Sequence, residues 1–463
     1  MARSAACPIF AANLKAMKEM KKQIAIVGLL LMPLFGWSQT AWTVEQCMRY
    51  AVKHNHEVTQ QRLTVEDYRS DKTQAVGAFL PSLHASVGNQ YNFGRAIDPE
   101  TNTYTNVSTF YNGYSVSASI PLFDGFQRVS EWRLAKANLL MGRHGLRAKQ
   151  DEVALAVFQA YIDLLYYRGT VEMARQKREE SAQLLRQTRT MAEVGTKSEA
   201  DVAQMEATQA ADDYEVTRQE GLLAQALLVL KRQMNYPAEE TLIVEPMADD
   251  EAEPIEEPTD RDAAAIVEVA QVINPKLLEA EQSLSAAKQS LRVAKSGLYP
   301  TISLGAGIST SYYKTIGNAN AKPFGDQFRN NVGEYLSATL SIPLFNRLTT
   351  LTQIRKQRHA VRRAEENLAY QRSELERLIA EALIDRENSR MESRKMAKKV
   401  EADRLAARLT IRQYEEGLAT SIDVQTATVT LLQSQAQQLQ SRLTFLYKDK
   451  LVNYYKGEAL WTE

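Results

Sequence analysis

Side chains that could perform chemistry are few in this sequence, and they are not arranged for it. His54 and His56 could bind a metal, but they project to different faces of a helix, and no Cys or Met cluster accompanies them. The Gly305-Ala306-Gly307 stretch matches part of a nucleotide-binding loop, but it lies within a strand pattern with no helix after it. Nothing pairs a Ser or Cys nucleophile with a base. The sequence therefore predicts no enzyme, no metal site and no cofactor.

Charge and cysteine usage exclude further classes. The 56 Lys and Arg residues balance 56 Asp and Glu residues, so there is no electrostatic reason to expect a nucleic acid partner. The two cysteines are Cys7 and Cys47, and Cys7 would be removed with an N-terminal leader. We therefore expect a mature chain with one thiol and no internal disulfide, stabilised by packing alone.

The first residues have the pattern of an export signal. Lys18, Lys21 and Lys22 precede an apolar run over residues 24–35, and small residues at Gly36 and Ser38 favour cleavage before residue 39. This run of about 12 residues is shorter than the roughly 20 that a transmembrane helix needs. We predict a signal peptide over residues 1–38, with translation starting at Met17 or Met20. No later apolar run reaches about 18 residues, so any membrane segment must be a strand.

The rest of the chain is an internal duplication. The sequence Ile-Pro-Leu-Phe begins at Ile120 and again at Ile342, a separation of 222 residues. Ile162-Asp163 and Ile384-Asp385 have the same separation, as do Gly195 and Gly417. A period this long indicates a duplicated half rather than a short solenoid repeat. We predict a first repeat over residues 39–236 and a second over 261–463, joined by an acidic, proline-containing segment over 237–260.

Each repeat contains two strand patterns. We predict strands at about 82–94, 111–123, 301–313 and 334–345, each with alternating apolar and small polar residues. The polar face is nearly all Ser, Gly, Thr and Asn, whereas a soluble sandwich usually has Lys, Glu and Arg there. A lipid-facing band outside and a wet lumen inside fit this pattern better. Four strands cannot close a membrane barrel, so the chain must oligomerise, and a dimer with eight strands or a trimer with twelve would satisfy this constraint.

Long helices separate the strand pairs. No proline interrupts residues 128–190 or 348–414, where apolar or small residues recur every seven positions, as in side-by-side coiled-coil contacts. Each long helix ends at Gly195 or Gly417 and is followed by a second helix, over 198–234 or 421–455, which predicts two long hairpins. Shorter helices over 44–76 and 261–294 lead into the strands. The predicted helix-strand boundaries are at prolines: Pro81, Pro121, Pro300 and Pro343.

This duplicated plan resembles the TolC family of outer membrane efflux proteins. The resemblance rests on the Ile-Pro-Leu-Phe-Asp-Gly-Phe stretch over 120–126, on the turn sequences over 195–202 and 417–424, and on the opening helix from Trp42 to Asn55. It implies an α+β membrane protein of TolC-like fold, with a long α-helical barrel and a shared transmembrane β-barrel of four strands per protomer. The implied assembly is a homotrimer in the outer membrane, with twelve strands in one barrel and a helical tunnel in the periplasm.

The resemblance also implies a function and partners. Family members are the exit duct of tripartite efflux pumps or type I secretion systems, and they dock on a periplasmic adaptor (membrane fusion) protein that joins an inner-membrane pump. Transport through such a duct is passive. Exporters of drugs, metals, peptides and proteins all use ducts of this family, so the duct does not reveal the exported substrate. The alternative from another class is a soluble periplasmic coiled-coil adaptor or scaffold, which would explain the signal and hairpins but not the four strands.

By the same resemblance, the hairpin turns form the periplasmic tip, which closes the resting channel and meets the adaptor. The residues that match this tip are Gly195, Thr196, Asp201, Gly417, Ser421 and Asp423. Asp201 and Asp423 could form acidic rings that bind cations at the entrance, or they could cap the following helices. Gln204 and Thr426 stand where some members have a second acid, and Leu418-Ala419 stand where an Arg can act as a latch.

Overall fold

The structure is a computed structural model that describes residues 41–98, 102–106, 108–245, 263–317 and 322–461. These residues fall into two units. In the small unit, the Trp42 N–H donates to the Ile243 carbonyl at 2.8 Å, and the Glu245 N–H donates to the Trp42 carbonyl at 3.0 Å. All helices and strands named below belong to the large unit. The predicted signal over 1–38 lies outside the described residues, and the acidic segment is described only to residue 245, so both stay predictions.

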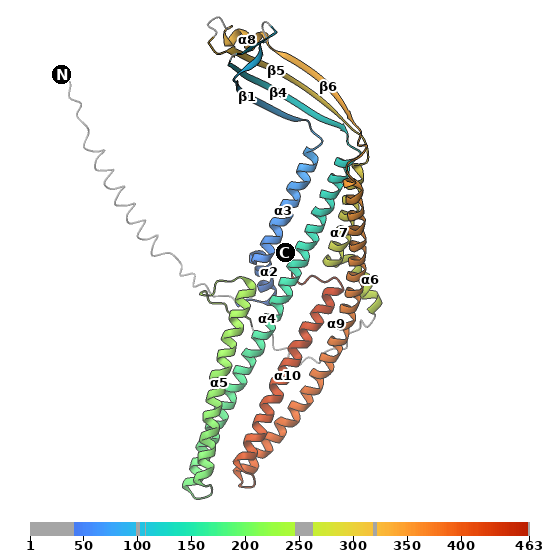
Figure 1. Cartoon of the computed structure of the whole chain (residues 1–463). Helices are drawn as coiled ribbons and strands as arrows, with labels where there is room; N and C mark the ends of the chain where they lie inside the picture. Colours follow the sequence, from blue (N-terminus) through green and yellow to red (C-terminus); the bar gives the residue numbers. More distant parts are fainter. Residues whose placement is uncertain (1–40, 99–101, 107, 246–262, 318–321, 462–463) are drawn as a thin grey trace, which may run out of the picture. The chain divides into compact units, whose positions relative to one another are not determined.

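A four-stranded antiparallel sheet forms from the two duplicated strand pairs (Figure 1). Its order is β1 (Ser82–Asn92), β4 (Thr109–Phe123), β5 (Thr301–Thr315) and β6 (Gly333–Ser341). The last strand ends at Ser341, earlier than the predicted 345, because the pairing with β5 stops there before Pro343. Three elements of this region were not predicted: the paired short strands β2 (Arg95–Asp98) and β3 (Thr103–Asn106), and the helix α8 (Phe324–Asn330).

The register of the sheet puts the apolar residues of all four strands on one face. Leu83 lies opposite Ala118, Ala118 opposite Ala306, and Ala306 opposite Leu336. This apolar face is open, with Leu83 72% and Leu336 82% exposed. On the other face, the Ser86 and Ser115 hydroxyls form a hydrogen bond of 2.7 Å across the strands. An uncovered apolar face of this extent requires an apolar environment.

Two helical hairpins contain the longest helices. The helix α4 (Gln127–Glu193) packs with α5 (Glu199–Met234), and α9 (Thr349–Glu415) packs with α10 (Ser421–Tyr455). Each long helix has 67 residues, so each extends about 100 Å at 1.5 Å per residue. Within the described residues, no helix combines the length and apolar character that a membrane crossing needs.

The predicted heptad residues lie on the packed side of the long helices. In α4, Leu139, Val153, Ala160 and Ala174 are buried, and the positions between them in the heptad series, Leu146 and Tyr167, are half-buried. In α9, Ile354, Leu375 and Ala382 are buried, and Leu375 and Ala382 belong to a core cluster with Ile379 and Val452. This narrow buried stripe is the packing expected of helices in a single layer.

The shorter helices differ from the sequence prediction. Residues 44–76 do not form one helix but two, α2 (Val44–His54) and α3 (His56–Gly77), and the second repeat likewise has α6 (Ala263–Ile273) and α7 (Pro275–Ser296). The breaks fall at equivalent residues, Asn55 and Asn274, which are extended and cap the next helix. The Asn274 side chain accepts from the Lys276 and Leu277 N–H groups at 3.1 and 3.2 Å.

The junction between helices and strands of the first repeat is organised by Arg128. Its Nε donates to the Asp124 carboxylate at 2.6 Å, and its terminal nitrogens donate to the carbonyls of Ala78, at 3.1 Å, and Pro121. Pro121 lies inside β4, next to the register shift between Pro121 and Phe123. One half-buried guanidinium therefore joins the end of α3, the end of β4 and the start of α4. At the equivalent position the second repeat has Thr350, which accepts from the Asn346 side chain.

Replacing Arg128 by Gln should destabilise the folded protein by about 1–3 kcal/mol, because two backbone carbonyls and a carboxylate lose their donor in a poorly hydrated junction. The measurement is thermal unfolding in detergent followed by circular dichroism. Arg133→Gln, one turn and a half further along the exposed side of α4, is the matched control and should change little. Equal melting curves for wild type and Arg128→Gln would show that the junction does not depend on this side chain.

Candidate functional site

The ends of the two hairpins are built alike. Gly195 and Gly417 have φ angles of +82° and +76°, a conformation that favours glycine. The Gly195 N–H donates to the Ala192 carbonyl at 3.0 Å, and the Gly417 N–H donates to the Tyr414 carbonyl at the same distance. The next N–H in each turn, of Thr196 or Leu418, donates to the carbonyl one residue further back, of Met191 or Gln413. These bonds pair the last carbonyls of each long helix and reverse the chain.

A capping box starts each return helix. The Ser198 hydroxyl accepts from the Asp201 N–H at 3.2 Å, and the Asp201 carboxylate accepts from the Ser198 N–H and hydroxyl at 3.1 and 2.7 Å. Thr420 and Asp423 form the same box in the second hairpin, with contacts of 2.6–3.2 Å. The hydroxyl, and then the backbone N–H, lower the pKa of both carboxyl groups. Both aspartates are thus occupied as helix caps in this structure.

The other two predicted tip residues have local roles. The Thr196 hydroxyl donates to the Met191 carbonyl at 2.8 Å, so it helps to close the end of α4. Ser421 is buried in the first turn of α10, directly after the Thr420 cap. The structure therefore brings Gly195, Thr196 and Asp201 together at one turn, and Gly417, Ser421 and Asp423 together at the other.

Tyr414 joins the two hairpins near these turns. Its hydroxyl forms a hydrogen bond of 3.0 Å with the Thr188 hydroxyl of α4, and the side chain is only 1% exposed. The Lys197 ammonium lies 3.8 Å from the centre of the Tyr414 ring. Burial raises the pKa of Tyr414, which keeps the hydroxyl neutral and able to donate. A further contact between the hairpins runs from Gln204 to Gln425 at 3.3 Å.

Sequence reasoning missed Tyr414, although the duplication contained a signal. Tyr414 stands three residues before Gly417, and the equivalent residue of the first repeat is Ala192, three residues before Gly195. Thr188 has an equivalent threonine at Thr410. Both repeats therefore have the threonine, but only the second repeat has the tyrosine. A residue that breaks the symmetry of a duplication at a turn is a candidate for a contact between the halves.

A small cavity of about 170 Å³ lies between the hairpins, next to the turns. A buried ion pair on its wall joins Lys177 of α4 to Asp212 of α5 at 2.8 Å. Burial raises the pKa of Glu180 beside this pair, while the Lys177 charge opposes that shift. Met205, Ile411 and Val424 supply the apolar part of the wall. The hairpins therefore enclose a small cavity beside the turns, with a wall of both polar and apolar side chains.

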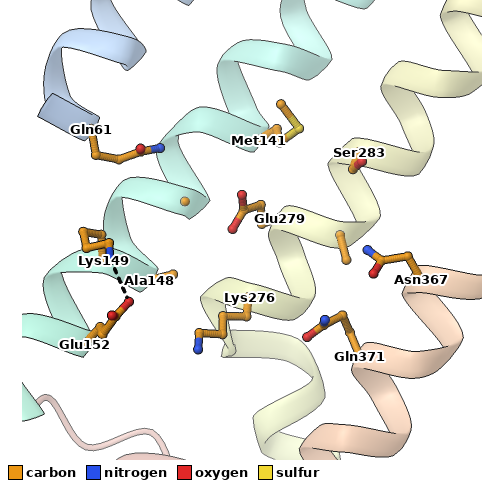
Figure 2. A pocket seen from close by; sticks show the side chains of 12 residues that line it. Gln61, Met141, Ala148, Lys149, Glu152, Lys276, Glu279, Ser283, Asn367 and Gln371 are labelled. Atoms are coloured by element: carbon orange, nitrogen blue, oxygen red, sulfur yellow. Dashed lines mark ion pairs between the residues drawn. The ribbon is translucent and has the colours of Figure 1, made fainter. Parts of the chain in front are cut away.

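A larger cavity of about 430 Å³ lies among α3, α4, α7 and α9, and Figure 2 shows its lining. Lys149 contacts Glu152 at 3.0 Å and Glu57 at 3.2 Å, so its charge is balanced. Burial raises the pKa of Glu279, which enters the cavity from α7 (Figure 2). Its carboxylate lies next to Gly145 of α4. The lining has mixed charges and no paired nucleophile and base, so this space is not arranged as a catalytic site.

The two histidines first considered as metal ligands lie on different helices, and one of them already has a hydrogen-bond partner. His54 ends α2, stacks on Tyr50 and hydrogen-bonds the Tyr50 carbonyl at 2.9 Å, while His56 begins α3. Burial raises the pKa of the Cys47 thiol to about 12, so it is not a nucleophile. Across the described part of the chain, no group of three or more His, Cys, Asp or Glu residues could hold a metal ion.

Comparison with known proteins agrees with this architecture. The family model described as outer membrane efflux protein matches residues 48–235 and 266–446, once for each repeat. The chain is 24% identical over 399 residues to the outer membrane efflux protein BepC of Brucella suis biovar 1 (strain 1330), covering 84% of this chain and 80% of that protein. It is also 24% identical over 272 residues to the pyoverdine export outer membrane protein OpmQ of Pseudomonas aeruginosa, covering 58% of this chain and 54% of that protein.

Solved structures share the fold. The channel CusC has a TM-score of 0.77 at 15% identity, with 90% of this chain and 92% of that chain covered. VceC of Vibrio cholerae has a TM-score of 0.74 at 15% identity, with 90% and 96% covered. The predicted TolC-like fold, with long helices and a four-stranded antiparallel sheet from a duplicated domain, is confirmed. The chain belongs to the outer membrane efflux protein family, the TolC family, and is an outer membrane channel of tripartite efflux and export systems rather than an enzyme.

Proposed function

We propose that three copies of this chain form one passive exit duct, with a shared barrel of twelve strands and a tunnel built from the long helices. The observation that carries the proposal is the sheet itself. Within the described residues, the outer edges of β1 and β6 pair with no other strand, and the apolar face of the sheet is open. Unpaired strand edges cannot face lipid, so β6 of one copy must pair with β1 of the next.

The partners follow from the hairpin ends. Three large apolar side chains, Val194, Leu418 and Ile422, are exposed at the two turns, and Leu418 is 76% exposed. Apolar residues at an otherwise polar helix end favour contact with another protein. A periplasmic adaptor fits this surface, because the channel has no energy source of its own and must receive substrate from an inner-membrane pump. The turns around Gly195 and Gly417 are then both the docking surface and the resting gate.

The trimeric duct predicts discrete channels from a particle of three chains. We expect the detergent-extracted protein to show a mass of three chains by light scattering and stepwise currents in a planar bilayer, because only a closed barrel removes the open edges. A soluble, non-conducting species would instead support the alternative of a periplasmic adaptor or scaffold. A conducting particle of two chains would support the proposed duct but contradict the twelve-stranded barrel.

The gate should depend on the hydrogen bond between Thr188 and Tyr414, because this contact holds the two hairpins together beside the turns. Tyr414→Phe and Thr188→Val should each raise the resting single-channel current several-fold, since losing a buried hydrogen bond of about 1 kcal/mol shifts a two-state equilibrium roughly fivefold. The double variant should add little to either single change. Tyr370→Phe, at an exposed position of α9, is the control. Resting currents equal to wild type in both single variants would reject this contact as part of the gate.

The two roles considered for Asp423 can be separated by pH. Its folded-state pKa is lowered by Thr420, so its capping contribution is present above the unfolded pKa of about 3.9 and is lost as pH falls through the lower folded value. Amide exchange in the first turn of α10, corrected for intrinsic rates, should therefore be protected at pH 7 and accelerate only in strong acid. Asp423→Asn should weaken this protection at pH 7 and remove its pH dependence.

If Asp423→Asn leaves amide exchange unchanged but raises resting current or abolishes cation block, the carboxylate acts in a ring at the entrance and not as a cap. The same comparison applies to Asp201, which has an equivalent capping box in α5.

A further inference from the structure

The helix α8, between β5 and β6, is held firmly against the sheet. The Gln327 amide accepts from the Tyr313 N–H at 3.0 Å and donates to the Tyr313 carbonyl at 2.9 Å, so it acts like a paired strand residue. The Asn331 amide donates to the Ser311 carbonyl at 2.8 Å, and the Thr310 hydroxyl donates to the Phe328 carbonyl at 2.7 Å. Figure 1 shows α8 at the end of the sheet where β5 and β6 are connected. These bonds fix the orientation of its two phenylalanines.

These phenylalanines lie on the apolar face of the sheet. Phe324 and Phe328 have ring centres 6.2 and 5.3 Å from that of Tyr114, and Phe324 is 5.4 Å from Tyr312. Tyr114 shares a strand face with Val116, which lies opposite Ile308 in the register. The face covered by α8 is therefore the one that the proposed barrel turns toward lipid.

Phe324 and Phe328 continue a row of aromatic rings across three strands. Tyr91 contacts Phe110 at 4.8 Å between ring centres, and Phe110 contacts Tyr312 at 6.2 Å. We call this row the aromatic belt; its members are Tyr91, Phe93, Phe110, Tyr114, Tyr312, Phe324 and Phe328. Although they are packed against tyrosines, Phe324 and Phe328 remain 47% and 38% exposed. Aromatic side chains with one packed and one open side are typical of a membrane interface.

The position of the belt matches the thickness of an outer membrane. On β4, Tyr114, whose ring contacts both phenylalanines of α8, lies nine residue steps from Phe123 at the helical end of the strand. Nine steps span about 30 Å along a strand, or about 23 Å along the membrane normal at a tilt of about 40°, close to the height of the apolar band in such barrels. The phenylalanines of α8 thus lie about one bilayer core away from the helices, at the outer leaflet.

Cationic side chains accompany the belt at this level. Lys314 lies opposite Phe110 in the register, Lys322 is next to the start of α8, and Arg329 follows Phe328. All three are exposed. Asp326 and Glu334 are the acids nearby, so cations exceed acids. Cations beside interfacial aromatics are suited to phosphate groups of lipids.

We propose that α8 is a membrane-interface element that binds phosphorylated lipid headgroups of the outer leaflet. Phe324 and Phe328 lie at the boundary between headgroups and acyl chains, and Lys314, Lys322 and Arg329 contact the lipid phosphates. The occupant is a lipid because the surface continues the apolar strand face of an outer membrane channel. This inference rests on the proposed barrel, and the experiment below separates the two.

Depth-dependent fluorescence quenching tests the position of α8. Phe328→Trp trimers are reconstituted in phosphatidylcholine bilayers brominated either near the headgroup or near the chain ends, with the wild-type signal of the native tryptophans subtracted. We expect at least about twofold stronger quenching by the shallow bromines. Tyr111→Trp, on the opposite sheet face three residues before Tyr114, should be quenched by neither. Leu336→Trp, on the apolar face near mid-strand, should be quenched most by the deep bromines.

The controls distinguish the possible failures. Quenching of Leu336→Trp without quenching of Phe328→Trp would contradict the interface position of α8 but support the barrel. Absence of quenching at both positions would reject the barrel itself.

Lipid selectivity tests the cations. Trimers carrying Lys314→Gln, Lys322→Gln and Arg329→Gln together are compared with trimers carrying Lys395→Gln, Lys398→Gln and Arg408→Gln on the exposed surface of α9. Native mass spectrometry in equal phosphatidylglycerol and phosphatidylcholine should show a preference for phosphatidylglycerol that falls about fivefold or more only in the first variant. Added inorganic phosphate should not displace the lipid. An equal preference in both variants, or displacement by phosphate, would overturn the assignment of these cations to lipid headgroups.

Discussion

A strand in lipid has no water to hydrogen-bond its backbone, and this constraint governs the molecule. Within each chain, β1, β4, β5 and β6 hydrogen-bond to their neighbours in the sheet, but the outer edges of β1 and β6 have no strand partner among the described residues. A single chain in lipid cannot satisfy those groups, so the proposed closure by three copies follows from the same physics as the exposed Leu83 and Leu336. The helices inherit this symmetry, because one end of each of the four sheet strands continues into a helix.

The duplication supplies equivalent scaffolds, and its differences supply the specific contacts. Both hairpins end in a glycine of positive φ followed by a capping box, because a long helix needs its terminal carbonyls and N–H groups paired before the chain reverses. The halves diverge where they meet other elements. Arg128 and Asp124 form an ion pair where Thr350 and Asn346 form a neutral bond, and Tyr414 replaces the small Ala192. The contact between Thr188 and Tyr414, which joins the two hairpins, thus arises where the two repeats differ in sequence.

Much of the fold and part of the candidate site were predictable. Alternation along β1, β4, β5 and β6 predicted both the strands and the face that each residue occupies, since a strand has a period of two. Glycine turns predicted the hairpins. The breaks at Asn55 and Asn274 were missed, because a capping asparagine inside a continuous apolar pattern reads as helix until its side chain is seen to bind the next N–H groups. The helix α8 was missed because seven residues are too few for a periodic pattern.

The sequence by itself determined the elements, the duplication and the apolar face, because these depend on periodicity and on residues near one another in the chain. It left open whether Asp201 and Asp423 cap helices or face the entrance, and the structure shows each carboxylate hydrogen-bonded to the residue three positions before it, Ser198 or Thr420. Tertiary structure alone brought Thr188 to Tyr414 and Phe324 to Tyr114, pairs more than 200 residues apart. No local pattern encodes such contacts, since they depend on how the two repeats pack together.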